Sequence, residues 1–457
     1  MGRSKAILVI LMICLVCRLI FFLAVKPWDQ QVRDRIILKA DALEYHQLAI
    51  TMAQDHQFAY KKDGPTDTFR TPLYPLFVSL IYFAQGQPRP WTVLIIQILI
   101  DTASCLLLFF LLAKFLTKRI ASYASLFYAV DPFFILYSIT LLSDILFVFL
   151  CILGAIFFSV PLAREFKERS SVWIALCALT FGLATLVRPV AQFIPFIICF
   201  FLLYFLRKDM KKGLGLIMLF FLFFLLTLSP WMIRNLVRFG TPSLSTVGSY
   251  DLVILYVQPM EIERRGQPFG DVRKALLKEA DQLMIRDGKD PQRMNEFQKD
   301  PYWRRLAFHY VAQYPFSFLK HFLFGILHTM GNLATGPYAE LLQLSNKTSN
   351  FQIKGHSTIS GLIKGWFNQK SRGEIGIGLT IALYSTGSYF LWALGLIVFW
   401  KTWRHQPFLW FSLLMTFYFI FIAGSAGLAR YKLPAVPFYL AFVGLGLHHI
   451  LYRNKRE

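Results

Sequence analysis

Charged residues are scarce in this sequence, and acidic residues are the scarcer kind. Only 16% of the 457 residues are charged, and 26 Asp and Glu stand against 48 Lys and Arg. Soluble proteins carry about 25% charged residues, whereas this chain is 56% hydrophobic with a mean hydropathy of +0.49. Several apolar runs reach or approach the roughly 20 residues that cross a hydrocarbon core, and the alternating strands of a membrane barrel are not visible. The composition predicts an all-α, polytopic helical membrane protein.

Signatures of several other protein classes are missing. All six cysteines lie inside apolar runs, so the sequence predicts no disulfide framework. The nine histidines show no metal-binding spacing. A phosphate-binding loop and a Gly-x-Ser-x-Gly motif are both absent, which argues against ATP-driven transport and serine hydrolysis. The net charge of +22 comes without a basic and aromatic module, so nucleic acid is not an expected partner.

The apolar runs predict where the chain crosses the membrane. The first run is longer than a signal-peptide core and no cleavage site follows it, so we expect an uncleaved span. Two runs, 72–84 and 315–335, are shorter or more polar. We expect 72–84 to be interfacial or re-entrant and 315–335 to be interfacial, with no net crossing by either. The expected spans are 6–25, 91–113, 120–138, 141–162, 171–187, 190–206, 213–231, 378–400, 406–424 and 432–452.

Loop charge predicts the orientation of these spans. With the N-terminus in the cytoplasm, the basic loops 114–119, 164–169 and 207–212 and the C-terminal tail fall inside, as the positive-inside bias expects. About ten crossings result, with both termini cytoplasmic. About twelve crossings, with 72–84 and 315–335 included, would place the middle basic loops outside, against that bias.

The orientation divides the chain into three parts. Residues 1–231 form an N-terminal transmembrane module that includes the outer loop 26–90. Residues 232–377 form extracytoplasmic loops with the interfacial segment 315–335, and residues 378–457 form C-terminal transmembrane helices. An amphipathic pattern over Val272–Ile285 predicts a helix in the middle part. We expect these outer loops to cap a cavity at membrane level.

Acidic side chains are rare here, so their positions carry information. Asp41 and Glu44 are three residues apart and share one face of an expected surface helix. Such carboxylates act as a general base or bind a divalent metal, or they form a solvated acidic face. Asp144 opens an apolar span, where it caps the helix, with or without a second role. Asp101 lies within a span, and we expect it to pair with a neighbouring helix.

Cations gather at the predicted outer ends of the spans. One such side chain alone is explained by snorkelling to the interface. Several on one face favour an anion, and Arg binds phosphate in a bidentate manner. These residues are Arg70, Arg188, Arg234, Arg430 and Lys432.

Short motifs, in their order along the chain, resemble one group of glycosyltransferases. An acid followed by Tyr and a helical Leu-Ala pair (Asp41–Ala49) precedes the Arg-Thr-Pro-Leu-Tyr-Pro run 70–75. A later acid, Asp144, heads a span in LLSDILF, and LVRP, PWMIRN and ARYKLP follow. The set resembles the GT-C superfamily, in particular its branch of protein O-mannosyltransferases, lipid A aminoarabinose transferases and lipopolysaccharide-core sugar transferases.

The resemblance implies an integral-membrane glycosyltransferase with residues 1–231 as its catalytic module. A polyprenyl-phosphate sugar would bind on the outer face, Asp41 would deprotonate the acceptor, and the sugar would transfer in one displacement with inversion. Glu44 and Asp144 would serve the acceptor or a metal. The cations that would hold the donor phosphate are Arg70, Arg188, Arg234, Arg430 and Lys432. The supporting residues would be Tyr45, His46 and Tyr74.

The sequence departs from this family at two points. Ala42 follows Asp41 where the family often has a second acid, which leaves Glu44 as the candidate for that role. Gln54-Asp55-His56-Gln57 replaces glycines that are usual near the end of the Leu-Ala helix. No cofactor is firmly indicated, and a divalent metal on Asp41 and Glu44 stays open.

The sequence supports a lipid-linked sugar transferase first, with a lipid, glycan or protein acceptor and membrane lipids as its other partners. We expect it in the bacterial inner membrane, with its active site on the extracytoplasmic face. One alternative is a lipid or sugar transporter or flippase, for which inverted repeats and charges near the midplane would be expected. The other is a non-catalytic scaffold of the same fold.

Overall fold

Helices are the main secondary structure in the part of the chain that the structure describes. This part of the computed structural model comprises residues 3–167, 169–344 and 370–452. It contains no β-strand, and its one isolated β-bridge pairs Ala59 with Thr66. The predicted all-α class and polytopic membrane architecture are confirmed. The basic C-terminal tail after Tyr452 and most of the predicted outer stretch 336–377 lie outside the described residues.

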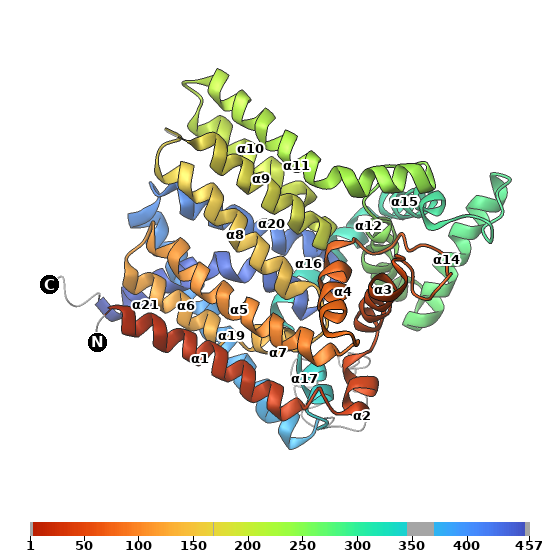
Figure 1. Cartoon of the computed structure of the whole chain (residues 1–457), viewed down its shortest axis with the longest axis horizontal. Helices are drawn as coiled ribbons and strands as arrows, with labels where there is room; N and C mark the ends of the chain where they lie inside the picture. The colour runs from red at the N-terminus through yellow and green to blue at the C-terminus, as the bar shows by residue number, and fades with distance from the viewer. Residues whose placement is uncertain (1–2, 168, 345–369, 453–457) are drawn as a thin grey trace.

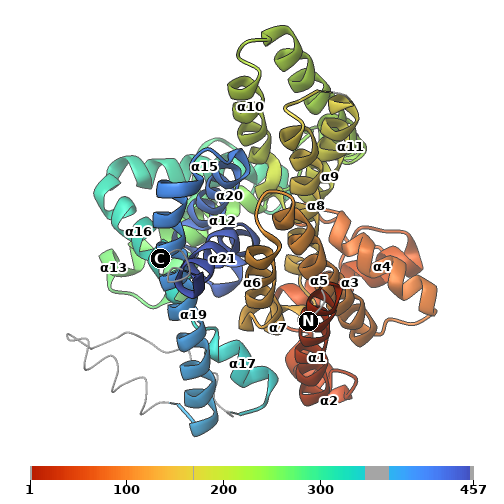
Figure 2. The same ribbon diagram turned by 90° about the vertical axis from the view of Figure 1, so that its left-hand side faces the viewer.

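Apolar helices from both halves of the chain form the membrane bundle (Figure 1). The first group is α1 (Arg3–Val25), α5 (Pro90–Ala113), α6 (Lys118–Ala129), α7 (Pro132–Ser138), α8 (Asp144–Ala163), α9 (Ser170–Val187), η2 (Pro189–Phe193), α10 (Ile194–Phe205) and α11 (Met210–Phe239). The second group is α19 (Arg372–Val398), η4 (Phe399–Trp403), α20 (Pro407–Ala423), η5 (Gly424–Ala426), η6 (Ala429–Ala435) and α21 (Val436–Tyr452). Figure 2 shows α10 and α11 at the edge of the bundle opposite α1.

Two connecting regions carry the remaining helices. The region between α1 and α5 holds α2 (Gln30–Val32), η1 (Arg33–Ile37), α3 (Asp41–Asp55) and α4 (Leu73–Gln85). The region after α11 holds α12 (Val247–Asp251), η3 (Leu252–Val257), α13 (Gln258–Arg265), α14 (Phe269–Arg286), α15 (Glu296–Gln313), α16 (Pro315–Gly331) and α17 (Thr335–Leu341). In Figure 1, α3, α4, α14 and α15 lie at the end of the molecule far from both termini.

Every predicted span corresponds to a helix, but two of them are not simple spans. In the described ranges, eight helices are long and apolar enough to cross a membrane, and a bent pair makes up to nine. That pair is α6 and α7, which meet at 52° where the sequence predicts one span over 120–138. The break follows from Asp131 and Pro132, because the Asp131 carboxylate caps the backbone nitrogens of Phe133 and Phe134 and proline favours a helix start. The predicted span 190–206 begins as the 3-10 turn η2 and is short.

The loops sort to opposite ends of the bundle. At one end, Phe115 stacks on Phe408 at 4.6 Å, and the guanidinium of Arg119 lies 5.0 Å from the ring centre of Tyr452. Phe166 and Phe205 stack there too. The basic loops that the sequence places on one side of the membrane therefore share one end of the molecule. The connecting regions that hold α3, α4 and α12 lie at the other end (Figure 1).

The two runs predicted to be interfacial are both helical. The 13 residues of α4 rise about 20 Å, less than the roughly 30 Å of a hydrocarbon core. The 17-residue α16 exposes Phe316 and Leu327 and packs on η5, where a β-carbon on Gly325 would overlap the backbone of Ser425. Their placement at the membrane interface stays a prediction.

The region after α11 has its own hydrophobic cluster. The amphipathic helix predicted at 272–285 is α14, which buries Val272, Leu276, Ala280 and Met284. These side chains pack with residues of η3 and α15, among them Trp303. The region after α11 is therefore a packed group of helices, because the apolar face of α14 is buried against η3 and α15.

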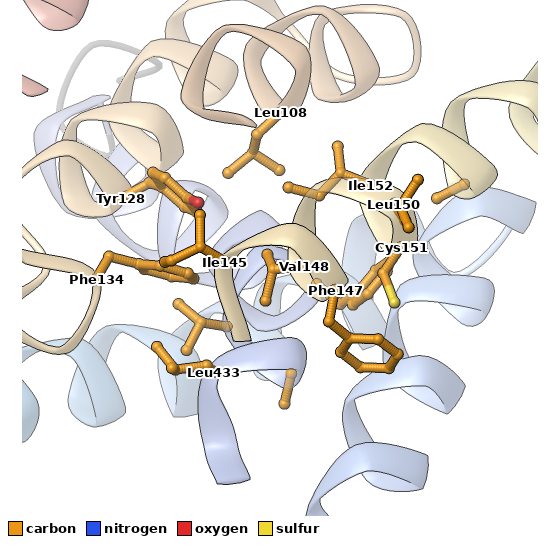
Figure 3. Packing of buried hydrophobic residues seen from close by; sticks show 14 of the residues in the cluster. Leu108, Tyr128, Phe134, Ile145, Phe147, Val148, Leu150, Cys151, Ile152 and Leu433 are labelled. Carbon is orange, nitrogen blue, oxygen red and sulfur yellow. The ribbon is translucent and has the colours of Figure 1, made fainter. Parts of the chain in front are cut away.

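α8 lies at the centre of the bundle. It packs against α5 and α9 and also contacts α7, α20 and η6. Figure 3 shows Leu108 of α5, Tyr128 of α6 and Leu433 of η6 around the α8 side chains, which are buried. The sequence predicts that Asp101 pairs with a neighbouring helix, and the structure pairs it with Arg18 of α1, while Tyr128 also donates to Asp101 at 2.6 Å. Buried charges inside a membrane need such partners, so this network ties α1, α5 and α6 together.

Glycines allow α19 and α21 to approach closely. A β-carbon on Gly395 would overlap the carbonyl oxygen of Phe442, and one on Gly446 would overlap that of Leu391. Small residues at helix contacts are the usual means of close packing in membranes, where burial of apolar surface supplies little driving force. The contact therefore depends on the absence of side chains at these two positions.

We predict that Gly395→Ala lowers the stability of the folded protein by about 1–3 kcal/mol, because the added methyl group separates α19 from α21. The measurement is the thermal midpoint of the purified protein in detergent. Gly387→Ala on the same helix is the matched control, since a β-carbon there meets nothing within 4 Å. Equal midpoints for the two variants would contradict the close approach.

Candidate active site

α3 presents its first turn to the candidate site. The helix packs on α4 and buries Tyr45, Leu48 and Ala49. Asp41 and Glu44 occupy its first turn, where the positive end of the helix dipole favours carboxylates. The two acids share a face, as their spacing predicts, and both contact Arg70.

Arg70 joins the two acids of α3. Its Nη2 donates to Oδ1 of Asp41 at 2.8 Å, and its Nε donates to Oε2 of Glu44 at 2.9 Å. The guanidinium lies 4.9 Å from the ring centre of Tyr45. The Asp67 carboxylate accepts from the backbone nitrogens of Phe69 and Arg70, at 3.2 and 2.8 Å. This turn directs Arg70 back towards α3.

A second arginine reaches Asp41 from the opposite end of the sequence. Nη2 of Arg430 in η6 lies 2.7 Å from Oδ2 of Asp41, so each carboxylate oxygen has a different guanidinium partner. Nη2 of Arg430 also lies 3.3 Å from the Tyr431 hydroxyl. The carboxylate of Asp41 therefore holds the first connecting region against the segment that precedes α21.

Asp144 and Arg188 form the adjoining ion pair. Asp144 at the start of α8 is buried and bonds Arg188, which follows α9. The Arg188 guanidinium lies 5.6 Å from the ring centre of Tyr431 and 5.8 Å from that of Phe147. The Tyr431 ring thus lies beside both the Arg430–Asp41 pair and the Arg188–Asp144 pair. We call the residues of this assembly the arginine cluster: Asp41, Glu44, Tyr45, Arg70, Asp144, Arg188, Arg430 and Tyr431.

The charges in the arginine cluster oppose the effect of burial. Burial alone raises the pKa of Asp41, but the neighbouring charges of Arg430 and Arg70 outweigh it and hold that pKa below its usual range. Burial alone would lower the pKa of Arg70, but Tyr45, Asp41 and Glu44 raise it. Asp41 is therefore an anion at any physiological pH, and Arg70 is a cation.

Arg234 and Lys432, which the sequence groups with these cations, lie elsewhere. Arg234 near the end of α11 faces a separate cavity of about 500 Å³, and its guanidinium lies 4.3 Å from the ring centre of Trp231. Lys432 lies on a different side of η6 from Arg430, with its Nζ 3.1 Å from the carbonyl oxygen of Met330. Residues two apart on a helix point in different directions, so Lys432 and Arg430 face different neighbours.

Of the predicted supporting residues, Tyr45 belongs to the arginine cluster, whereas Tyr74 and His46 have their polar contacts outside it. The Tyr74 hydroxyl donates to Oε1 of Gln97 at 2.6 Å, and its ring lies edge-on to Tyr45 at 4.7 Å. Nδ1 of His46 lies 2.8 Å from the Tyr82 hydroxyl of α4. Burial and the charge of Arg33 lower the pKa of His46 to about 4. His46 is therefore neutral at physiological pH and joins α3 to α4.

Comparisons with known proteins show which family model and which solved structures this chain is similar to. Residues 69–233 match the family model of dolichyl-phosphate-mannose-protein mannosyltransferase, a region that includes Arg70, Asp144 and Arg188. A crystal structure of the Archaeoglobus fulgidus oligosaccharyltransferase with a tethered acceptor peptide is 14% identical, with a TM-score of 0.53. The match covers 99% of this chain and 50% of that one. The chain has the GT-C fold.

Two further structures were matched. The archaeal oligosaccharyltransferase AglB of Archaeoglobus fulgidus, in complex with an inhibitory peptide and a dolichol-phosphate, is 14% identical with a TM-score of 0.51, covering 99% of this chain and 51% of that one. ArnT from Cupriavidus metallidurans, bound to undecaprenyl phosphate, is 13% identical with a TM-score of 0.43. The match covers 98% of this chain and 78% of that one. This chain spans about half the length of the oligosaccharyltransferases. A comparison with curated protein sequences found no match.

One acid near the arginine cluster of this GT-C chain was not singled out from its sequence. Asp251 ends α12, and its charge acts on the same groups as that of Asp41. A signal was present, because Asp251 directly precedes the apolar run Leu252–Val257, much as Asp144 directly precedes the apolar run that follows it in α8. The acid was missed because it lies in a long polar region with no motif of the GT-C resemblance.

A metal site does not take shape among the described residues. No group of three or more His, Cys, Asp or Glu side chains there could hold a metal ion. Asp41 and Glu44 both accept from Arg70 and do not converge on a shared open point. The divalent metal stays a prediction, and no step below uses one.

We predict that Arg70→Gln destabilises the protein by about 1–3 kcal/mol at neutral pH, because it removes the partner of two carboxylates. The cost stays below that of a fully buried pair, since the Glu44 side chain is 41% exposed and screened by solvent. The loss should shrink as the pH falls below about 4. The pKa of Asp41 is lower in the folded protein than in the unfolded chain, so its ionised carboxylate stabilises the fold. This contribution is fully present above the unfolded pKa, and it is lost as the pH falls through the folded pKa.

The measurement for Arg70→Gln is chemical or thermal unfolding of the purified protein over this pH range. Arg33→Gln is the matched control, because Arg33 pairs with Asp34 at 2.7 Å but both side chains are exposed by more than a third. The two variants should differ at neutral pH and converge in acid. Equal losses at neutral pH would show that the Arg70 contacts do not stabilise the fold.

Proposed function

We propose that this chain is an integral-membrane glycosyltransferase. It moves a sugar from a polyprenyl-phosphate donor to an extracytoplasmic lipid, glycan or protein acceptor, with inversion at the anomeric carbon. The observation that carries the proposal is the arginine cluster at one end of the helix bundle, in which Arg70 and Arg430 pair with an ionised Asp41 and Arg188 pairs with the adjoining Asp144. The GT-C fold supports it, and a structure of the archaeal relative contains a dolichol-phosphate.

The proposed donor phosphate binds to the arginines. Arg70, Arg188 and Arg430 come from three separate segments and supply planar donor groups that suit phosphate oxygens. The Nε atom of Arg430 is buried and has no hydrogen-bond partner in the described part of the chain. A phosphate oxygen would satisfy this donor. Arg234 and Lys432 lie outside the arginine cluster, so we now leave both out of this role.

An apolar surface beside Arg70 suits the lipid tail. Leu76, Leu80 and Phe83 of α4 are exposed by 39%, 58% and 69%. Their spacing of four and three residues places them on one face of the helix. Because α4 begins three residues after Arg70, this face leads away from the proposed phosphate site. An isoprenoid chain on α4 would leave its phosphate within reach of the arginines.

The proposed transfer is a single displacement. The acceptor oxygen forms a bond to the anomeric carbon while the bond from that carbon to the phosphate oxygen breaks. The leaving lipid phosphate takes the electron pair, and the arginines stabilise its charge. The acceptor proton goes to a carboxylate, a role that the GT-C resemblance gives to Asp41. Glu44 and Asp144 hold Arg70 and Arg188 in place.

The distribution of basic residues supports the proposed orientation. The loops around Lys114, Arg164 and Lys208 lie at the end of the bundle opposite the arginine cluster. Basic loops favour the cytoplasmic side, so the proposed site opens on the extracytoplasmic face. For a bacterial host this is the outer face of the inner membrane.

We predict that loss of this protein removes one sugar from a surface glycoconjugate and leaves its lipid-linked donor to accumulate. The test is mass spectrometry of surface glycans, envelope lipids and polyprenyl-phosphate sugars, with and without the protein. The missing sugar identifies both donor and acceptor. A profile without any change in glycoconjugates would contradict the proposed transfer.

Asp41→Asn should lower sugar transfer about 10²-fold or more, because it removes the carboxylate that holds two of the proposed phosphate-binding arginines. The change keeps the size of the side chain and removes its charge, so Arg70 and Arg430 lose their common partner. The assay is restoration of the missing sugar in cells that lack the wild-type protein. Asp34→Asn is the control, because Asp34 is exposed and pairs only with Arg33. Full restoration by Asp41→Asn would favour a non-catalytic scaffold.

A further inference from the structure

The acids around the arginine cluster differ in their partners. Asp41 accepts from two arginines, Glu44 accepts from Arg70, and Asp144 accepts from Arg188. Asp251 is partly buried among the same arginines, and in the described part of the chain it has no hydrogen bond or ion pair. A carboxylate that is free of guanidinium partners keeps its lone pairs for a proton or a substrate hydroxyl.

Two sets of contacts fix Asp251 between the segments that carry Arg70 and Arg430. On one side, the backbone nitrogen of Thr246 donates to the carbonyl oxygen of Thr68 at 3.1 Å. The Tyr250 ring packs edge-on against Phe69 at 5.5 Å. These contacts join α12 to the two residues that precede Arg70.

On the other side, η3 is joined to the segment before Arg430. The Ser425 hydroxyl donates to the carbonyl oxygen of Leu255 at 2.5 Å, and the Tyr256 hydroxyl donates to that of Ile422 at 2.9 Å. A β-carbon on Gly424 would overlap the Tyr256 ring. Asp251 follows the first set of contacts and precedes the second, so it is held between the segment that carries Arg70 and the segment that carries Arg430.

We propose that Asp251, rather than Asp41, takes the proton of the attacking acceptor group. This inference rests on the proposed function. The acceptor O–H bond breaks and its proton passes to a carboxylate oxygen of Asp251, while the acceptor oxygen bonds to the anomeric carbon. The bond from that carbon to the donor phosphate oxygen breaks, and the phosphate leaves with the electron pair. Asp41 acts as a positioning residue that holds Arg70 and Arg430 for the phosphate.

The pKa values of Asp251 and Asp41 are shifted in opposite directions, as expected if Asp251 accepts the proton and Asp41 stays ionised. Burial raises the pKa of Asp251 to about 7, and the negative charge of Asp41 adds to this effect. The positive charges of Arg70, Arg430 and Arg188 lower the pKa of Asp251 but do not outweigh burial. A general base is most effective when its pKa lies near the working pH. The pKa of Asp41 is shifted the other way, and pairs of acids with divergent pKa values mark distinct roles.

The test is the pH dependence of transfer by the purified full-length protein in lipid nanodiscs. The donor probe is the radiolabelled pool of polyprenyl-phosphate sugars extracted from host membranes, and the acceptor probe is the host envelope extract. We expect the wild-type rate to rise with pH through about 7, as Asp251 ionises. Asp251→Asn should lower the rate by about 10² or more and abolish the rise.

Two variants distinguish a proton acceptor from a structural residue. Asp251→Glu keeps a carboxyl group and should retain the rise with pH at a reduced rate. Asp41→Asn should lower the rate at every pH and keep the rise, because it disturbs the arginines only. Asp271→Asn on α14 is the control, since Asp271 is exposed, and should match the wild type. The proposal is overturned if Asp251→Asn keeps the rise or if Asp41→Asn alone abolishes it.

A stability measurement checks Asp251 without the need for a substrate. Because its folded pKa is raised, ionisation costs stability as the pH rises from about 4, the unfolded pKa, through about 7. Asp251→Asn should therefore melt at a higher temperature than the wild type at alkaline pH, and the difference should vanish near pH 4. The absence of any difference at alkaline pH would contradict an unpaired, buried carboxyl group.

The two proposals fail in different ways. If the wild type transfers no sugar from the donor pool, the proposed function and the role of Asp251 are both wrong. If the wild type transfers sugar and Asp251→Asn is unimpaired, only the role of Asp251 is wrong.

Discussion

The carboxylate of Asp41 is the contact on which the arrangement of the site depends. One oxygen accepts from Arg70 and the other lies 2.7 Å from Arg430. Arg70 belongs to the first connecting region and Arg430 to the segment before the last helix, 360 residues further along the sequence. A single neutral side chain could not hold two guanidinium groups together, because their like charges repel each other. The ionised carboxylate offsets this repulsion and brings both ends of the chain to one site.

The membrane bundle explains why such a cluster forms at one end. Helices that cross a hydrocarbon core satisfy their backbone groups internally, so polar chemistry is pushed to the loops and helix ends. α8 is packed on several sides by other helices (Figure 3), and its first residue, Asp144, therefore has a fixed position. Within the bundle, Asp101 is neutralised by Arg18. That pair is buried among the helices, whereas the arginine cluster lies at the end of the bundle, where we propose that a lipid phosphate and an acceptor meet.

Local patterns in the sequence predicted the helices well, because each span satisfies its own hydrogen bonds and needs only apolar length. The predicted break points were less accurate. Asp131 and Pro132 begin a new helix inside an apolar run, and hydropathy does not register a capping carboxylate. Among the predicted site residues, the structure brings together Asp41, Glu44, Arg70, Asp144, Arg188 and Arg430. Arg234 and Lys432 are predicted to lie on the same side of the membrane as these residues. The side of the membrane does not specify the direction in which a side chain points, so it could not show that these two lie elsewhere.

The sequence by itself determined the helical membrane class, the segregation of basic loops and the spacing that puts Asp41 and Glu44 on one helical face. These properties depend on local periodicity and composition. Only the tertiary structure decided which charges meet, because contacts such as Asp41 with Arg430 join segments that are remote in sequence. It also decided that Lys432 contacts Met330 and not the partners of Arg430, and that Asp251 has no hydrogen-bond or ion-pair partner among the described residues. Packing sets the direction of a side chain and its burial, and a single sequence contains no direct record of either.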